Sequence, residues 1–213
     1  MARRWSALAA LQFKVGQAMI AGHFGFAALV KSRERQVPLW ALMLATVWLD
    51  IIFVPLFLAR IETLTPVTGL DGGYGQNIIY ADYTHSLLGA LLLSAVFGAA
   101  CAIPWGKRCG WVLGFVSFSH WLLDLVVHRQ DMPLLPGNLG HLPRLGFGLW
   151  QLRIGSIAAE LALVTCGAWF YLRAARSVTT SAHFGQKRAM ITGLLILICG
   201  VAILALDVTG ILG

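Results

Sequence analysis

Three polar side chains recur at every fourth position inside an apolar stretch of the chain. His120, Asp124 and His128 stand in the run from Phe118 to His128, whose other members are mostly apolar. On a helix, residues four apart lie on one face. Imidazole nitrogens and carboxylate oxygens that share a face can bind a metal ion together. The spacing therefore predicts a metal-binding face on a helix.

The composition indicates that this face lies inside a membrane. Of the 213 residues, 58% are hydrophobic and 12% are charged, and the mean hydropathy is +0.76. These values are typical of a membrane protein. An ionisable side chain in hydrocarbon costs about 2.5 to 3.5 kcal/mol on insertion scales, so a bound ion or a paired group must offset that cost.

Six stretches are long and apolar enough to cross a bilayer, which takes about 20 such residues. They cover residues 9–30, 37–59, 84–103, 109–128, 154–174 and 190–212. No linker or repeat divides the chain. We therefore expect an all-α fold, a polytopic membrane helical bundle of about six transmembrane helices, forming one integral membrane domain over residues 1–213. The expected location is the bacterial inner (plasma) membrane, as a multi-pass protein.

Two longer connections separate the expected spans, and charge places both outside the cytoplasm. Residues 60–83 are rich in turn formers, and the prolines of residues 129–153 indicate an ordered cap rather than a helix. The opposite side carries nine cations in short loops: Lys31, Arg33, Arg35, Lys107, Arg108, Arg173, Arg176, Lys187 and Arg188. Because cytoplasmic loops carry an excess of lysine and arginine, we expect this side to face the cytoplasm. The first apolar run continues past Lys14 to Val30, so we expect no cleaved signal peptide.

Most ionisable residues of the expected spans fall at one depth, beneath the two long connections. They are Asp50, His85, His120, Asp124, His128, Glu160 and Asp207, while His23 lies deeper. Nitrogen and oxygen donors without thiolate suit zinc, manganese or iron, and imidazole with carboxylate is the usual zinc set of hydrolytic sites. Such an ion lowers the pKa of its water to about 7. We therefore expect a divalent metal, with zinc as the first choice.

Simpler roles remain open for several of these residues. A lone histidine such as His23 more often hydrogen bonds to a neighbouring helix than binds a metal. Glu160 and Asp207 more often pair with Arg153 or with a loop cation. His128 stands at the end of its expected helix, where an interfacial imidazole is ordinary.

The net charge of +7 does not indicate a nucleic-acid partner. The basic residues flank the expected spans, where topology and anionic lipid headgroups account for them. The four cysteines show no CxxC spacing, so neither a disulfide framework nor a cysteine metal site is expected. The expected partners are membrane lipids, a small-molecule or lipid substrate, and further membrane proteins if the chain belongs to a complex.

Two short motifs resemble those of the YdjM-like membrane-bound metal-dependent hydrolases. Thr84-His85-Ser86 resembles the Thr-His-Ser motif of that family, and the His120 to Asp124 segment resembles its His-x-x-x-Asp motif. Further likenesses are Gly22-His23-Phe24 to its early histidine and Leu49-Asp50 to its Leu-Pro-Asp segment, so the resemblance covers residues 20–136. The family is distantly similar to zinc-dependent phospholipases C and related nucleases, which implies a helical fold and phosphoester hydrolysis.

The chain departs from the family pattern at two places. Ile52 stands where the family often has a second aspartate, and Tyr80 stands where it often has a histidine. One carboxylate and one imidazole are therefore missing, and Asp82 is the nearest substitute. This favours a single metal, or a site without catalysis, over a full multi-metal centre.

The leading hypothesis is a membrane-embedded metal-dependent hydrolase acting on a phosphoester or lipid-like substrate at the non-cytoplasmic face. The metal ligands it assigns are His23, Asp50, His85, His120 and Asp124. Asp82 or His128 would act as general base or would orient a ligand. Two other classes remain open: a transporter or proton pathway, in which buried acids and histidines relay ions, and a structural subunit with a degenerate metal site.

Overall fold

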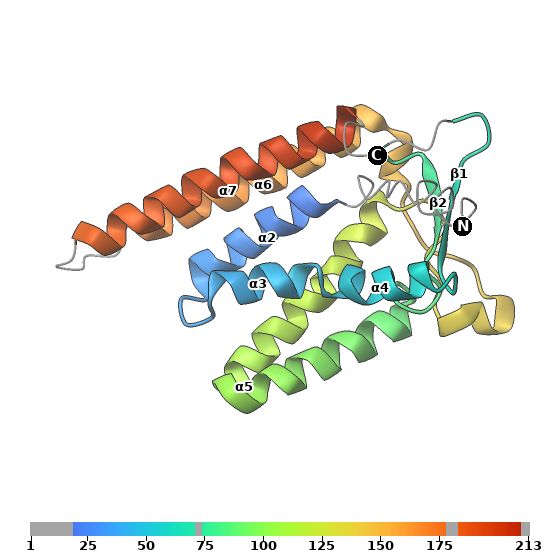
Figure 1. Ribbon diagram of the computed structural model, residues 1–213, viewed down its shortest axis with the longest axis horizontal. Helices are drawn as coiled ribbons and strands as arrows, with labels where there is room; N and C mark the ends of the chain where they lie inside the picture. The colour runs from blue at the N-terminus through green and yellow to red at the C-terminus, as the bar shows by residue number, and fades with distance from the viewer. Residues whose placement is uncertain (1–18, 71–73, 178–182, 210–213) are drawn as a thin grey trace, which may run out of the picture.

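The computed structural model describes residues 19–70, 74–177 and 183–209. Its helices are α2 (Ile20–Arg33), α3 (Leu39–Thr46), α4 (Trp48–Leu58), α5 (Leu87–Val127), α6 (Arg153–Arg176) and α7 (His183–Thr209). Strands β1 (Thr63–Pro66) and β2 (Asn77–Tyr80) pair antiparallel, and the 3-10 helices η1 (Pro136–His141) and η2 (Leu149–Gln151) precede α6. In Figure 1, α6 and α7 run side by side, α2 packs on α6, and α3 and α4 lie nearly end to end beside the folded-back α5.

α5 is a helical hairpin. Its helical backbone breaks at Gly106, whose φ of +82° is a conformation that glycine adopts without strain. The two arms then run back along each other (Figure 1). The hydroxyl oxygens of Ser94 and Ser117 lie 2.9 Å apart between them. Each arm has about twenty residues, the length that crosses hydrocarbon. The arms correspond to the spans expected at residues 84–103 and 109–128.

α2 and α6 approach at a distance that only glycine permits. A Cβ atom at Gly25 would stand 2.5 Å from the carbonyl oxygen of Leu163, and one at Gly167 would stand 2.0 Å from the carbonyl oxygen of Gly25. Small residues at helix interfaces in membranes let backbones come this close. The contact holds α2, and with it His23, against the rest of the bundle.

The continuous helix expected over residues 37–59 is instead two helices. α3 ends at Thr46, α4 begins at Trp48, and their axes differ by 45°. At the break, the Val47 N–H donates to the carbonyl of Leu44, three residues back, as in a 3-10 turn. The break falls beside the candidate site, where the carbonyl of Thr46 has a role described below.

The chain is a membrane protein of the helical type, but the number of spans stays a prediction. Among the described residues, α5, α6 and the part of α7 over Gln186–Thr209 are long and apolar enough to cross a membrane, and the bent pair of α3 and α4 would add a fourth. α2 has 14 residues, fewer than the stretch expected at residues 9–30, whose first part lies outside the described residues. The structure is mostly helical, as expected, and the connection over residues 60–83 adds one short hairpin, in which Thr63 of β1 pairs with Tyr80 of β2.

Replacing Gly167 with leucine should weaken the bundle. The added side chain has no room against the backbone of α2, and overpacking of this kind costs about 1 to 3 kcal/mol or more. Thermal unfolding of the purified protein in detergent should show a lower midpoint than wild type.

Ala162→Leu is the matched control, because Ala162 lies exposed on the same helix. Equal midpoints for the two variants would contradict the close packing of α2 on α6.

Candidate metal centre

Six side chains meet where α2, α4 and the second arm of α5 come together. His23 comes from α2 and Asp50 from α4, while His85 immediately precedes the start of α5. The other three are consecutive members of the four-residue pattern: His120 and Asp124 within α5, and His128 at its C-cap. All are buried except Asp50, whose side chain is 26% exposed.

The donor atoms nearest the centre form two triangles that share one edge. That edge joins the Nε2 atoms of His85 and His120, which lie 3.2 Å apart. One triangle is completed by Asp50 Oδ1, at 3.6 and 3.5 Å from the two nitrogens. The other is completed by Asp124 Oδ2, at 3.5 and 3.0 Å from them. Two ligands about 2.0 to 2.1 Å from a tetrahedral zinc ion stand about 3.3 to 3.4 Å apart, so either triangle has the size of one face of a zinc site.

The orientation of the His120 ring is fixed by the helix break. Its Nδ1 atom lies 2.6 Å from the carbonyl oxygen of Thr46, which can only accept. Nδ1 therefore carries the hydrogen, and in the neutral ring Nε2 carries the lone pair. That lone pair faces the Asp124 carboxylate at 3.0 Å. Two acceptors at this distance repel unless a proton or a metal ion lies between them.

His128 is held in a similar way. Its Nδ1 lies 2.9 Å from Asp131 Oδ1, and its Nε2 faces Asp124 Oδ2 at 3.7 Å. Asp131 is itself buried and accepts the backbone N–H of Ile79 from β2. The ring of His128 also packs against Trp150, with centroids 4.5 Å apart. Metal-binding histidines commonly have the second ring nitrogen bound to a carboxylate or a carbonyl in this way.

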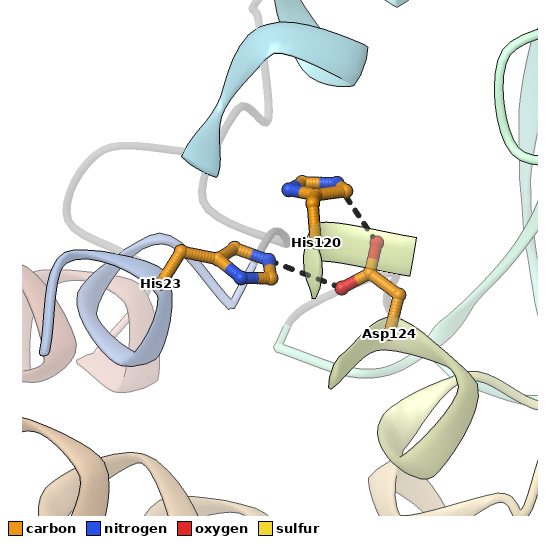
Figure 2. A group of neighbouring side chains, drawn as sticks. All are labelled: His23, His120 and Asp124. Carbon is orange, nitrogen blue, oxygen red and sulfur yellow. Dashed lines mark hydrogen bonds and ion pairs between the residues drawn. The ribbon is translucent and has the colours of Figure 1, made fainter. Parts of the chain in front are cut away.

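His23 completes the cluster from the opposite side of Asp124. Figure 2 shows its Nε2 directed at the Asp124 carboxylate, with Oδ1 at 3.2 Å, while His120 contacts the other oxygen. The His23 and His120 rings stack with centroids 4.1 Å apart. Within the described residues, His23 Nδ1 has no hydrogen-bond partner. His23 Nε2 is therefore placed either to hydrogen bond to Asp124 or to bind a metal ion beside it.

Asp82, a proposed general base, does not join the cluster. Its two carboxylate oxygens accept from the Arg144 guanidinium at 2.7 and 2.9 Å. This ion pair raises the pKa of Arg144. Arg144 also donates to the backbone carbonyl of Asp131, whose carboxylate contacts His128, so this ion pair lies at the edge of the cluster.

Glu160 and Asp207 form no part of the metal cluster either, and Arg153 does not pair with them as the sequence suggested. Glu160 accepts from the Tyr74 hydroxyl and from the backbone N–H of Gly22. Arg153 donates instead to the carbonyl of Val208. Burial, with the negative charge of Glu160, raises the pKa of Tyr74.

Three residues that support the cluster were not identified from the sequence. Thr46 acts through its backbone, which no side-chain pattern reveals. Asp131 stands three residues after His128, a spacing that was visible but that lies outside the expected helix. Glu62 is an isolated acid in a turn, and it is fully buried against the Thr84-His85 segment.

No family model, no curated protein and no solved structure matches this chain. What the site does is therefore inferred from its own residues and their geometry.

Replacing His120 with asparagine should remove zinc from the purified protein. The change deletes the nitrogen common to both triangles and leaves two donors in each, one fewer than the three protein ligands of a catalytic zinc site. Elemental analysis after zinc loading and dialysis gives the zinc content per chain.

His141→Asn is the matched control, because His141 is exposed and its φ of +48° is one that asparagine tolerates. Zinc retained equally by the two variants, or absent from wild type, would rule out this centre.

Proposed function

We propose that the chain is a six-span membrane protein that holds zinc in the cluster and hydrolyses a phosphoester of an amphiphilic substrate at the non-cytoplasmic face. The observation that carries the proposal is the pair of triangles joined at His85 and His120, whose edges of 3.0 to 3.6 Å suit a zinc ion. Three ligands from one triangle leave a fourth position open. Catalytic zinc sites have this composition, while structural sites are closed by four protein ligands.

Zinc in the open site would polarise the substrate and lower the pKa of a water molecule to about 7, which makes water a nucleophile at neutral pH. Side chains of the cluster accept and donate the proton. We assign proton transfer to His128, because Asp131 binds its Nδ1 and would stabilise the imidazolium. Asp82 is the weaker choice as base, since Arg144 occupies both of its oxygens.

The proposed substrate class follows from the residue of the cluster that is most exposed, Asp50, and from its neighbours. Asp50 is 26% exposed at its side chain, whereas the side chains of Asp124 and the four histidines are at most 6% exposed. The exposed neighbours of Asp50 on α4 are apolar: Ile51, Val54 and Leu58. A partly exposed carboxylate residue beside exposed apolar side chains of the same helix suits a substrate with a hydrocarbon tail and a polar head. A phosphoester of a lipid is such a molecule.

A second candidate function is an ion or proton pathway, favoured by the break between α3 and α4. Broken helices with free carbonyls beside buried acids are typical of transporter binding sites. Here the carbonyl of Thr46 is bound to His120, which orients the ring rather than coordinating an ion. We therefore place this function second.

Zinc-loaded protein in lipid nanodiscs should release phosphate or alcohol from lipid phosphoesters faster than from a water-soluble aryl phosphoester. Chelation should abolish the activity and added zinc should restore it. Asp50→Asn should also abolish it, because the change removes the ligand at the opening.

Zinc-loaded protein that hydrolyses none of the phosphoesters tested would contradict the proposed function. Proton-coupled ion uptake in liposomes that is lost in Asp124→Asn would then favour the pathway.

A further inference from the structure

Glu62 is a fully buried acid that the proposed reaction does not use. It lies between α4 and β1, and its side chain is turned inward against the segment before α5. Arg60, two residues before Glu62, has a φ of +59°, which is rare outside glycine. The chain therefore turns sharply here, and Glu62 faces the interior. Burial of a carboxylate is costly unless several donors bind it. The identity of those donors gives Glu62 its role.

The Glu62 carboxylate accepts from three donor groups of two neighbouring residues. Oε1 accepts the backbone N–H groups of Tyr83 and Thr84, both at 2.8 Å, and these groups can only donate. The Thr84 hydroxyl lies 3.1 Å from Oε1 and 2.9 Å from Oε2. An ionised carboxylate only accepts, so the single hydroxyl hydrogen of Thr84 is directed at Glu62.

The direction of that hydrogen decides which nitrogen of His85 can bind a metal. The Thr84 hydroxyl oxygen lies 2.8 Å from His85 Nδ1. Because its hydrogen is used on Glu62, the oxygen accepts from Nδ1–H. The neutral ring then carries its lone pair on Nε2, the atom that faces His120 and both aspartates.

We propose that Glu62 is a positioning residue for the metal centre, acting through Thr84 to hold His85 in the tautomer that binds a cation through Nε2. The metal-binding part of this inference rests on the proposed function, while the tautomer is a property of the metal-free protein. The arrangement extends the usual carboxylate–histidine–zinc relay by one hydroxyl group. It makes the loop after α4 part of the site, although Glu62 touches no metal ligand directly.

A purely structural role for Glu62 would be to bind the two backbone N–H groups and so anchor the start of α5. Glu62→Gln separates the two roles. The glutamine carbonyl would replace Oε1 and keep both backbone hydrogen bonds, whereas its NH₂ group would replace Oε2 and donate to Thr84. The two lone pairs of that carbonyl oxygen would be taken by the N–H groups of Tyr83 and Thr84. The Thr84 hydroxyl would therefore donate to His85 Nδ1, which moves the ring hydrogen to Nε2.

The experiment measures side-chain ¹⁵N chemical shifts of histidine in the metal-free, full-length protein, followed by zinc affinity. Wild type should show a hydrogen on His85 Nδ1, and Glu62→Gln should show Nδ1 without one and the ring hydrogen on Nε2. Zinc affinity should fall by about 10- to 100-fold in the variant, as changes to outer-shell partners of metal ligands do. Glu34→Gln is the control, since Glu34 pairs with Arg108 on an exposed surface away from the site.

Thr84→Ser and Thr84→Val supply a second test that does not depend on Glu62→Gln folding. Serine keeps the hydroxyl and should keep both tautomer and affinity, while valine should lose affinity. An unchanged tautomer in Glu62→Gln, or equal affinities for the serine and valine variants, would overturn the proposal. Absence of zinc binding in wild type would instead overturn the proposed function, and the ¹⁵N shifts would still decide the role of Glu62.

Discussion

The candidate centre depends on one hydrogen bond, from His120 Nδ1 to the carbonyl oxygen of Thr46. A carbonyl cannot donate, so this contact at 2.6 Å sets the tautomer of His120 and directs the Nε2 lone pair into the cluster. Nε2 then faces two aspartates and a second imidazole. Such an assembly of lone pairs and negative charge, with little access to water, requires a cation. A metal ion meets this requirement with the donor types and spacings present.

The architecture around the centre keeps these groups in place. The break between α3 and α4 presents the Thr46 carbonyl, which a continuous helix would use in its own hydrogen bonding. The glycine contact between α2 and α6 brings His23 against Asp124 from the far side. The connection between α5 and α6 supplies Asp131 and Trp150 around His128, and the β1–β2 hairpin binds Asp131 through the Ile79 N–H. Each histidine ring is thus fixed by a different element of the fold.

The sequence pointed to residues that the structure brings together, because ionisable side chains are rare in apolar spans. The four-residue spacing of His120 and Asp124 was enough to place them on one face. A common depth grouped Asp50 and His85 with them but also with Glu160 and Asp207, and only the family-like motifs separated the two sets. The helix break was not predictable, since Thr46-Val47 contains neither glycine nor proline. Strands of four residues gave no periodic signal at β1 and β2. The pairing of Asp82 with Arg144 gave no local signal, because the two residues are 62 positions apart in sequence.

The central claim is that a cation binds between imidazole nitrogens and carboxylate oxygens, with no sulfur ligand. X-ray absorption at the zinc edge of the purified, zinc-loaded protein tests it most directly. We expect a shell of nitrogen and oxygen neighbours at about 2.0 to 2.1 Å, with the multiple scattering of at least two imidazoles. A sulfur shell at about 2.3 Å, or a zinc ion surrounded by water oxygens alone, would contradict it.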